Sequence, residues 1–505
     1  MTPSLILSLI AAYFALLLVV AWFTSRRSDN ATFFLGNRKS PWYLVAYGML
    51  GASLSGVTFI SIPGWVGTSQ WHYYQIVLGY IAGYFIIGHV LMPVYYRLRV
   101  TSIYTFLHER LGFWSYKTGA AFFLLSKVVG ASFRLFLVAM VLQVFVFDAW
   151  NVPFEVTVFV TILLIWLYTF RGGIKTIVWT DTLQTTFMLS AMILSIILIG
   201  KELGWGFTDM IAHVAQSPMS DIFDWKVASP SFFPKHFIAG AFIAATMTGL
   251  DQDQMQKNLS CRNLKEAQRN IHWQVFLFPI ANLFFLSLGV LMYAFAAVKY
   301  SALGSGVDVH AGMSFLGSEI GVNYRGTDDV YPMLALKFLS PVVGVLFVIG
   351  LIAAAYSSAD SALTALTTSF CVDFLGMSEQ HDERRKRYLV HIGASLVLMG
   401  TIMLFKLIDN RTVIDQIFTF ASYTYGPLLG VFSFGIFTKR NVVDRLVPII
   451  CIMAPIICYL LQMYSADLFG GYKIGYELLV INGMLTFLGL LAISRPQSSL
   501  IPETS

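Results

Sequence analysis

The sequence predicts an all-α integral membrane protein with about 13 transmembrane helices. Of its 505 residues, 57% are apolar and only 12% are charged, whereas soluble proteins average about 25% charged residues. The mean hydropathy is +0.70, and apolar runs of about 20 residues, the length that crosses a bilayer, recur along the whole chain. These observations exclude a soluble enzyme, a disordered protein and a small disulfide-stapled secreted protein.

The predicted spans follow one another with short connections. They cover residues 3–23, 42–70, 72–96, 118–147, 152–170, 176–200, 234–256, 272–298, 330–372, 389–408, 412–438, 443–463 and 474–494. The long segment 330–372 has room for a loop helix ahead of its span. The first run begins at Met1 without a basic region or a small-residue cleavage site, so we expect a retained helix and not a signal peptide.

The positions of the basic residues predict the orientation. With the N-terminus outside, most of the 33 Lys and Arg residues fall in cytoplasmic loops, as the positive-inside rule requires. The odd number of spans then places the C-terminus in the cytoplasm. The basic run 384–387 is explained by this rule, so no nucleic-acid partner is predicted. The expected location is the plasma membrane, and the absence of a large terminal extension favours a bacterial inner membrane.

Two spans are predicted to be broken helices. The second span, 42–70, contains five glycines and Pro63, and the seventh, 234–256, contains Gly240, Gly249 and then Asp251. Unpaired backbone is tolerated inside a membrane only where it lines a cavity or is buried in protein, and corresponding broken helices in two halves mark transporter binding sites. Glycines that only allow close helix packing are the alternative.

The broken spans also predict the domain organisation, because each would begin a block of five helices. The blocks cover residues 42–200 and 234–438. An extra helix and loop, 1–30, precede them, and two helices within 443–494 follow.

A stripe of oxygen-bearing side chains runs along the ninth span. Ala354, Ser357, Ser358 and Ser361 share one helix face, and Asp360 flanks it. Hard cations prefer oxygen ligands. Ordinary hydrogen bonds to the preceding helical turn would explain the serines, but a carboxylate within a membrane needs a partner. Asp181, near the start of the sixth span, either faces this stripe or lies at the cytoplasmic interface.

Four stretches carry a family resemblance: residues 53–64, 172–184, 251–257 and 353–361. With them the chain resembles the sodium/solute symporter family, which includes sodium-coupled galactose, proline and sialic-acid transporters. The resemblance implies the LeuT-type inverted-repeat fold and sodium-coupled import, by alternating access, of a small polar solute such as a sugar, a sugar acid, an amino acid or a carboxylate. The implied partners are that solute, sodium and the lipid bilayer, with no protein partner evident.

The resemblance also implies sodium ligands. A first site would use the carbonyls of Gly51, Leu54 and Ala354 with the hydroxyls of Ser357 and Ser358. A second site would use Asp181, Ser357, Asp360 and Ser361. The family members that have this second site carry a hydroxyl residue at the position of Asp360. Two carboxylates could therefore hold a second sodium ion, which we favour, or create a proton site.

The implied solute pocket lies at mid-membrane between the broken helices. Its candidate residues are Ser55, Thr58, Tyr73, Tyr74, Gln75 and Asp251. Sialic-acid transporters hold a carboxylate with an arginine of the fourth span, and Arg134 lies about one helical turn from that position. Asp251 could instead be an internal salt-bridge partner.

Three other functions compete with sodium symport. A proton-coupled transporter on the same scaffold is the closest. A membrane sensor would need a cytoplasmic output domain, and the segment after Ser494 is short. An intramembrane enzyme would need a clustered catalytic set, so no enzymatic activity is predicted.

Overall fold

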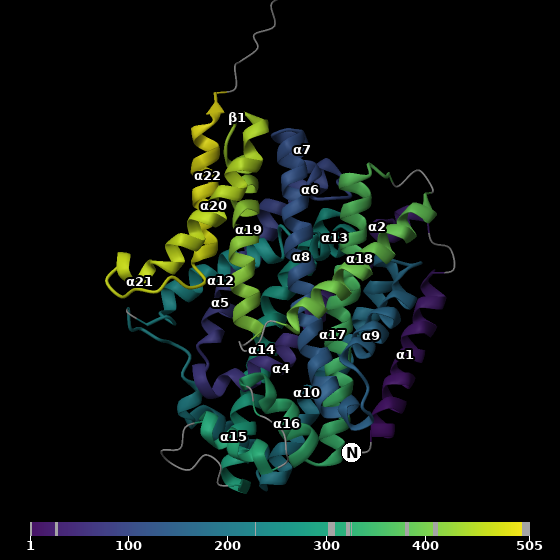
Figure 1. Ribbon diagram of the computed structural model, residues 1–505, viewed down its shortest axis with the longest axis vertical. Coiled ribbons are helices and arrows are strands. Elements are labelled where there is room, and N and C mark those ends of the chain that lie inside the picture. Colours follow the sequence, from purple (N-terminus) through teal and green to yellow (C-terminus); the bar gives the residue numbers. More distant parts are fainter. Residues whose placement is uncertain are drawn as a thin grey trace, which may run out of the picture.

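The structure is a bundle of long helices that run side by side (Figure 1). The computed structural model describes residues 3–25, 29–227, 229–300, 309–319, 324, 326–378, 383–407 and 413–496. Two short strands, β1 (Asn441–Val442) and β2 (Ser494–Arg495), pair antiparallel at one end of the bundle.

Each predicted span coincides with one helix or with consecutive helices. The helices are α1 (Pro3–Ser25), α3 (Trp42–Ser53) with α4 (Gly56–Ser69), α5 (Tyr73–Ile86) with η2 (Ile87–Leu91) and α6 (Met92–Leu98), α8 (Phe113–Leu142), α9 (Phe154–Thr169), α10 (Ile174–Leu203), α12 (Phe233–Met247) with α13 (Gln252–Leu259), α14 (Leu264–Tyr300), α17 (Pro341–Ser369) with η8 (Phe370–Phe374), α18 (Arg384–Phe405), α19 (Val413–Phe437), α20 (Val447–Met463) and α22 (Leu478–Ala492).

Short helices make the connections. They are α2 (Asn30–Leu35), η1 (Gly36–Arg38), α7 (Thr105–Arg110), η3 (Gln143–Phe147), η4 (Asp148–Trp150), α11 (Phe207–Gln216), η5 (Pro218–Ser220), α15 (Val309–Glu319), η6 (Thr327–Asp329), α16 (Val330–Met333), η7 (Leu334–Phe338), η9 (Asp444–Leu446) and α21 (Ser465–Leu468). The predicted segment 330–372 thus divides into α16, η7 and α17, with the expected loop helix ahead of the span.

Within the described residues, nine helices are long and apolar enough to cross a membrane, or up to ten when the bent pair α3 and α4 counts as one span. Helices α9 and α22 are apolar but shorter. The count of thirteen spans and the division into two five-helix blocks therefore stay predictions. Two helices begin before their predicted spans: α8 at Phe113, ahead of residue 118, and α14 at Leu264, ahead of residue 272. Both helices extend beyond their apolar runs into residues that include charged side chains.

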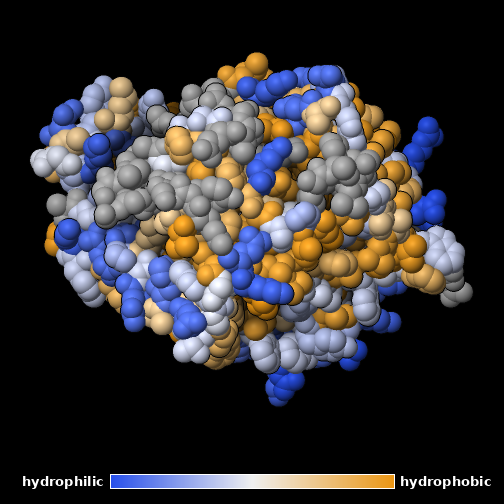
Figure 2. Space-filling view, turned by 90° about the horizontal axis from the view of Figure 1, so that it is seen from below, coloured by the Kyte–Doolittle hydropathy of each residue, from blue (hydrophilic) through white to orange (hydrophobic). Residues whose placement is uncertain are grey.

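Large apolar side chains cover much of the outside of the bundle. Phe276, Leu396 and Ile449 are 65%, 56% and 57% exposed although they lie within long helices. Figure 2, seen from the end of the molecule where α15 lies, shows hydrophilic side chains scattered among hydrophobic ones at that end. Exposed apolar faces of this extent on a bundle of long helices are explained by contact with lipid.

Glycines bring the backbones of α5 and α12 unusually close together. A Cβ atom at Gly79 would overlap the carbonyl oxygen of Phe237, and one at Gly240 would overlap that of Ile76. Since both obstacles are backbone atoms, they cannot move aside as a flexible side chain would. The two glycines therefore fix α12, in the broken seventh span, against α5, in the third span.

We expect Gly79→Ala to lower the melting temperature of the purified protein in detergent. The added methyl group forces α5 and α12 apart, and overpacking of this kind costs about 1–3 kcal/mol. Gly400→Ala on α18 is the matched control, because a Cβ atom added there would meet nothing within 4 Å and alanine favours a helix by up to about 1 kcal/mol over glycine. An equal response of both variants would contradict the packing argument.

Candidate functional site

The first break lies between α3 and α4, which meet at an angle of 52°. Leu54 and Ser55 leave the helical conformation, with ψ angles of 36° and 174°. The last carbonyl groups of a helix have no intrahelical donor, and Gly51 belongs to that last turn of α3. The break thus presents backbone oxygen atoms at the place where the sequence predicts sodium ligands.

The second break separates α12 from α13. Asp251 is extended and caps α13, since its side chain accepts a hydrogen bond of 2.8 Å from the backbone N–H of Asp253. The tyrosine hydroxyls of two neighbouring segments donate to the freed carbonyls: Tyr95 to Gly249 at 3.0 Å and Tyr104 to Leu250 at 2.9 Å. The discontinuities predicted in the second and seventh spans are therefore both present.

Helices α10 and α17 pack on the first break from two sides. A Cβ atom at Gly51 would overlap Thr185 of α10, and one at Gly56 would lie 3.7 Å from the backbone of Ala355 on α17. The predicted carbonyl ligands and the serine stripe thus come from elements in direct contact. Ser358 donates a hydrogen bond of 3.4 Å to the carbonyl of Ala354. This is the bond to the preceding helical turn by which the alternative interpretation explains the serines.

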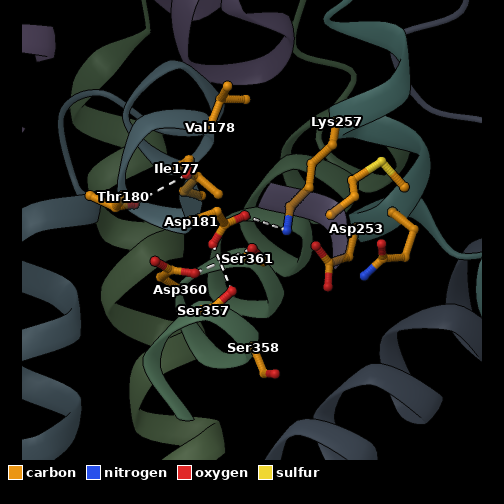
Figure 3. A network of polar contacts seen from close by, with 12 residues as sticks. Ile177, Val178, Thr180, Asp181, Asp253, Lys257, Ser357, Ser358, Asp360 and Ser361 are labelled. Carbon is orange, nitrogen blue, oxygen red and sulfur yellow. Dashed lines mark hydrogen bonds and ion pairs between the residues drawn. The ribbon is translucent and has the colours of Figure 1, made fainter. Parts of the chain in front are cut away.

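The two carboxylates of the predicted second site have different partners (Figure 3). Ser357 donates to Asp181 at 2.9 Å, so Asp181 faces the stripe. The ammonium of Lys257 on α13 lies 2.7 Å from the other oxygen of Asp181, and both side chains are 1% exposed. Asp360 instead accepts hydrogen bonds from Tyr168 at 2.9 Å and from Ser361 at 3.2 Å.

Sequence reasoning missed Lys257 and Tyr168. Lys257 lies within the stretch 251–257 that carries part of the family resemblance, and a lysine inside a membrane-spanning segment needs a carboxylate partner. That rule, applied to Lys257, could have assigned it to Asp181 or to Asp253. Nothing in the sequence around Tyr168 distinguishes it from other tyrosines at helix ends.

A cavity opens beside both breaks. Its lining includes the predicted residues Ser55, Thr58, Tyr73, Arg134 and Asp251, together with Ser53, Tyr80, Tyr84, Ser126, Lys127, Met247, Thr248, Gln254, Phe278, Phe418 and Tyr425. Five of the seven candidate solute residues therefore meet around one space, with hydroxyl, aromatic and charged groups at its wall.

Tyr74 and Gln75 do not belong to this lining. The amide of Gln75 donates to the carbonyl of Ser231 at 3.0 Å and accepts from the N–H of Asp224 at 3.4 Å. Gln75 is fully buried, so it fastens the segment that leads into α12. Its position in the sequence, two residues after Tyr73, predicts proximity to the cavity but not the direction of its side chain.

The charged groups of the cavity differ in their pairing. Lys127 lies 3.3 Å from Asp251 and 2.5 Å from Asp253, and Tyr425 donates to Asp251 at 2.5 Å. Asp251 is thus an internal salt-bridge partner, the alternative that the sequence left open. Arg134, in contrast, makes no hydrogen bond or ion pair with any part of the chain that the structure describes, although it lines the same cavity.

Comparison with known proteins agrees with this geometry. A model of the sodium:solute symporter family matches residues 33–443. The sodium/sialic acid symporter SiaT of Proteus mirabilis is 25% identical over 487 residues, which cover 94% of this chain and 92% of the relative. The human sodium-coupled monocarboxylate transporter 2 is 22% identical and is matched over 81% of this chain and 64% of its own length.

A solved structure has the same fold. It is the substrate-bound outward-open state of a Na⁺-coupled sialic acid symporter, with a TM-score of 0.79 at 21% identity over 97% of this chain and 99% of the other. The resemblance that the sequence motifs indicate is confirmed, because the family match spans most of the chain. This chain belongs to the sodium:solute symporter family and is a sodium-coupled membrane transporter of the LeuT-type fold, not an enzyme.

Proposed function

We propose that the transported solute is a small organic anion whose carboxylate binds to Arg134. The observation that carries this proposal is the guanidinium of Arg134 in the cavity between the broken helices, where it makes no hydrogen bond or ion pair with the described residues. Lys127 is already paired with Asp251 and Asp253, so Arg134 is the cationic group of the cavity left to bind a charged solute. A guanidinium forms paired hydrogen bonds with a carboxylate in a fixed geometry.

Two further observations support an anionic solute. The hydroxyls of Ser55, Thr58 and Tyr73 line the same cavity and can bind the polar groups of an acid or a sugar acid. Two relatives are named for sialic acid and for monocarboxylates, both of which are carboxylates. Sugar acids and simple carboxylates are therefore the first candidates, ahead of neutral sugars.

We expect sodium to couple to this solute through the first break. Sodium bound between the carbonyls of Gly51 and Leu54 and the hydroxyls of α17 would hold α3 against the stripe. That would order the cavity wall at Ser55, and the solute must then tighten sodium binding by the same factor. An inside-negative potential adds about 2.3 kcal/mol per charge per 100 mV to sodium entry.

Arg134→Gln is expected to raise the KM for uptake of an organic anion into proteoliposomes by about 10- to 100-fold. That range corresponds to the loss of charge-assisted hydrogen bonds of about 1.5–3 kcal/mol. Arg269→Gln, an exposed arginine at the start of α14, is the matched control and should leave uptake unchanged. Unaltered KM in Arg134→Gln across a panel of acids would contradict the proposal.

Ser358→Ala is expected to weaken the sodium dependence of uptake about tenfold, because it removes one hydroxyl ligand of the first site. The stabilisation by sodium, measured as the melting temperature in sodium chloride against choline chloride, should shrink with it. Ser395→Ala is the control, since the hydroxyl of Ser395 on α18 donates to the carbonyl of His391 on its own helix. Uptake driven by a pH gradient without sodium would instead favour the proton-coupled alternative.

We also propose a bacterial inner membrane as the location, with the N-terminus outside and the C-terminus in the cytoplasm. Basic residues at the predicted cytoplasmic ends support this orientation. Lys201→Cys should react with a membrane-impermeant maleimide on intact cells, whereas Lys386→Cys should react only after permeabilisation. The four native cysteines are buried and give little background. The reverse labelling pattern would overturn the orientation.

A further inference from the structure

A patch of basic side chains lies where three chain segments meet at one end of the bundle. The segments are residues 36–43, 95–100 and 260–266. The backbone N–H of Ser40 donates a hydrogen bond of 3.0 Å to the carbonyl of Ser260, and the hydroxyl of Tyr96 donates one of 3.2 Å to the carbonyl of Cys261. Figure 1 shows α2 and α6, which precede or carry two of these segments, toward the end of the bundle opposite α15.

The patch is strongly positive. Its basic residues outnumber its acidic residues by six to one, and the acidic residue is Glu266. The basic residues are Arg38, Lys39, Arg97, Arg99, Arg262 and Lys265. All of them except Arg38 are exposed, and none forms an ion pair with any residue that the structure describes. Like charges brought together in this way attract anions.

Two of the arginines are held on unusual backbone. Arg38 and Arg99 have positive φ angles of 52° and 49°, a left-handed conformation that is uncommon for residues other than glycine. The guanidinium of Arg38 donates to the carbonyls of Arg99 and Val100, both at 3.1 Å, and so closes the C-terminal end of α6. The segments 36–43 and 95–100 are therefore fixed to each other before any ligand arrives, which lowers the entropy that is lost when a ligand binds.

Aromatic side chains follow the patch along α3 and α14. Trp42 and Trp273 stack with their ring centroids 6.4 Å apart, and Trp273 and Tyr43 are 47% and 58% exposed. Tryptophan and tyrosine are enriched where the hydrocarbon core of a bilayer meets the headgroups. The basic side chains of the patch therefore lie at the level of the headgroups, next to a surface that acyl chains can contact.

We propose that this patch binds the headgroup of an anionic phospholipid, whose acyl chains lie against Trp42 and Trp273. A phosphodiester carries the negative charge that the patch lacks, and guanidinium groups bind phosphate oxygens through paired hydrogen bonds. Basic clusters directly beside a membrane-spanning helix recognise such headgroups. The positive-inside rule accounts for the sign of these charges, but it does not bring three separate segments together around a place with so few carboxylates.

The patch adjoins both broken spans and is separate from the solute cavity. The segment 36–43 leads into α3, and the segment 260–266 connects α13 to α14. None of the patch residues, all of which the structure describes, lines the cavity. A bound headgroup therefore holds the start of α3 and the end of α13 together, so anionic lipid should stabilise the folded transporter whichever solute it carries.

The melting temperature of the purified protein tests the site. It is measured in a neutral detergent with added phosphatidylglycerol or, at the same mole fraction, phosphatidylcholine, and choline chloride sets the ionic strength. We expect a higher melting temperature with phosphatidylglycerol, because a ligand of the folded state stabilises it, and a smaller difference at high choline chloride, because salt screens the charges. Arg97→Gln with Arg262→Gln, which removes charge from two segments, should abolish most of that difference.

The matched control is Lys439→Gln with Arg445→Gln. These exposed basic residues lie between α19 and α20, on the same predicted side of the membrane, so this double variant removes an equal charge at a distance in the sequence from the patch segments. It should keep the full response to phosphatidylglycerol. Lys39→Gln with Lys265→Gln keeps the arginines of the patch and should also reduce the response, which serves the test if the first pair fails to fold.

Other results would overturn the proposal. Equal melting temperatures in the two lipids would show that the patch does not distinguish headgroup charge. An equal loss of the response in the control variant would assign it to the overall charge of the protein, and a full response in both patch variants would place the lipid elsewhere. Stabilisation by inorganic phosphate equal to that by phosphatidylglycerol would make the patch a site for a soluble anion instead of a lipid.

Discussion

Backbone hydrogen bonding inside a bilayer is the constraint on which the rest of this structure depends. A helix that breaks in mid-membrane exposes carbonyl and amide groups for which lipid offers no partner. At the second break, the hydroxyls of Tyr95 and Tyr104 satisfy the freed carbonyls. At the first break, the oxygens lie between α10 and α17, where a cation can take the place of a protein donor. The same irregularity thus creates both the structural problem and the place where we propose that sodium binds.

Charged side chains near the breaks also need partners, because lipid offers none. Each of the two ammonium groups near the breaks contacts a carboxylate from a different helix, so Lys257 ties α13 to α10 and Lys127 ties α8 to α13. Such pairs are weak evidence for added stability, because desolvation offsets much of the attraction. Their value lies in the register that they impose on the broken helix. Arg134 lies outside these pairs, and it is the cavity group that we propose for the solute.

The sequence predicted more of the fold than of the site. Apolar runs and clustered glycines carry a strong signal, so the structure has helices over the predicted spans and has both breaks, while the count of thirteen spans stays a prediction. Of the two positions left open for Asp181, the structure has the one that faces the stripe. The pairing of Lys257 with Asp181 depends on how α13 turns after its break, which no periodicity encodes. Gln75 shows the same limit, since Tyr73, two residues before it, lines the cavity while the amide of Gln75 bonds to the segment before α12.

The place of α1 could not be predicted for a further reason. This helix precedes both predicted blocks, and an interpretation based on two repeats gives it no role. Only the packing of α1 on α9 and α17, where Phe14 contacts Tyr168 and Tyr356, brings it to the stripe.

The two tyrosines at the second break have a consequence for hydration during the transport cycle. Their hydroxyls bond to Gly249 and Leu250 from the segments around α6 and α7. Any motion that separates those segments from α12 and α13 removes both donors at once. The released carbonyls must then be solvated, because leaving them bare costs several kcal/mol. Water therefore has to reach the second break in the same step, which makes the pathway beside it wet before anything leaves through it.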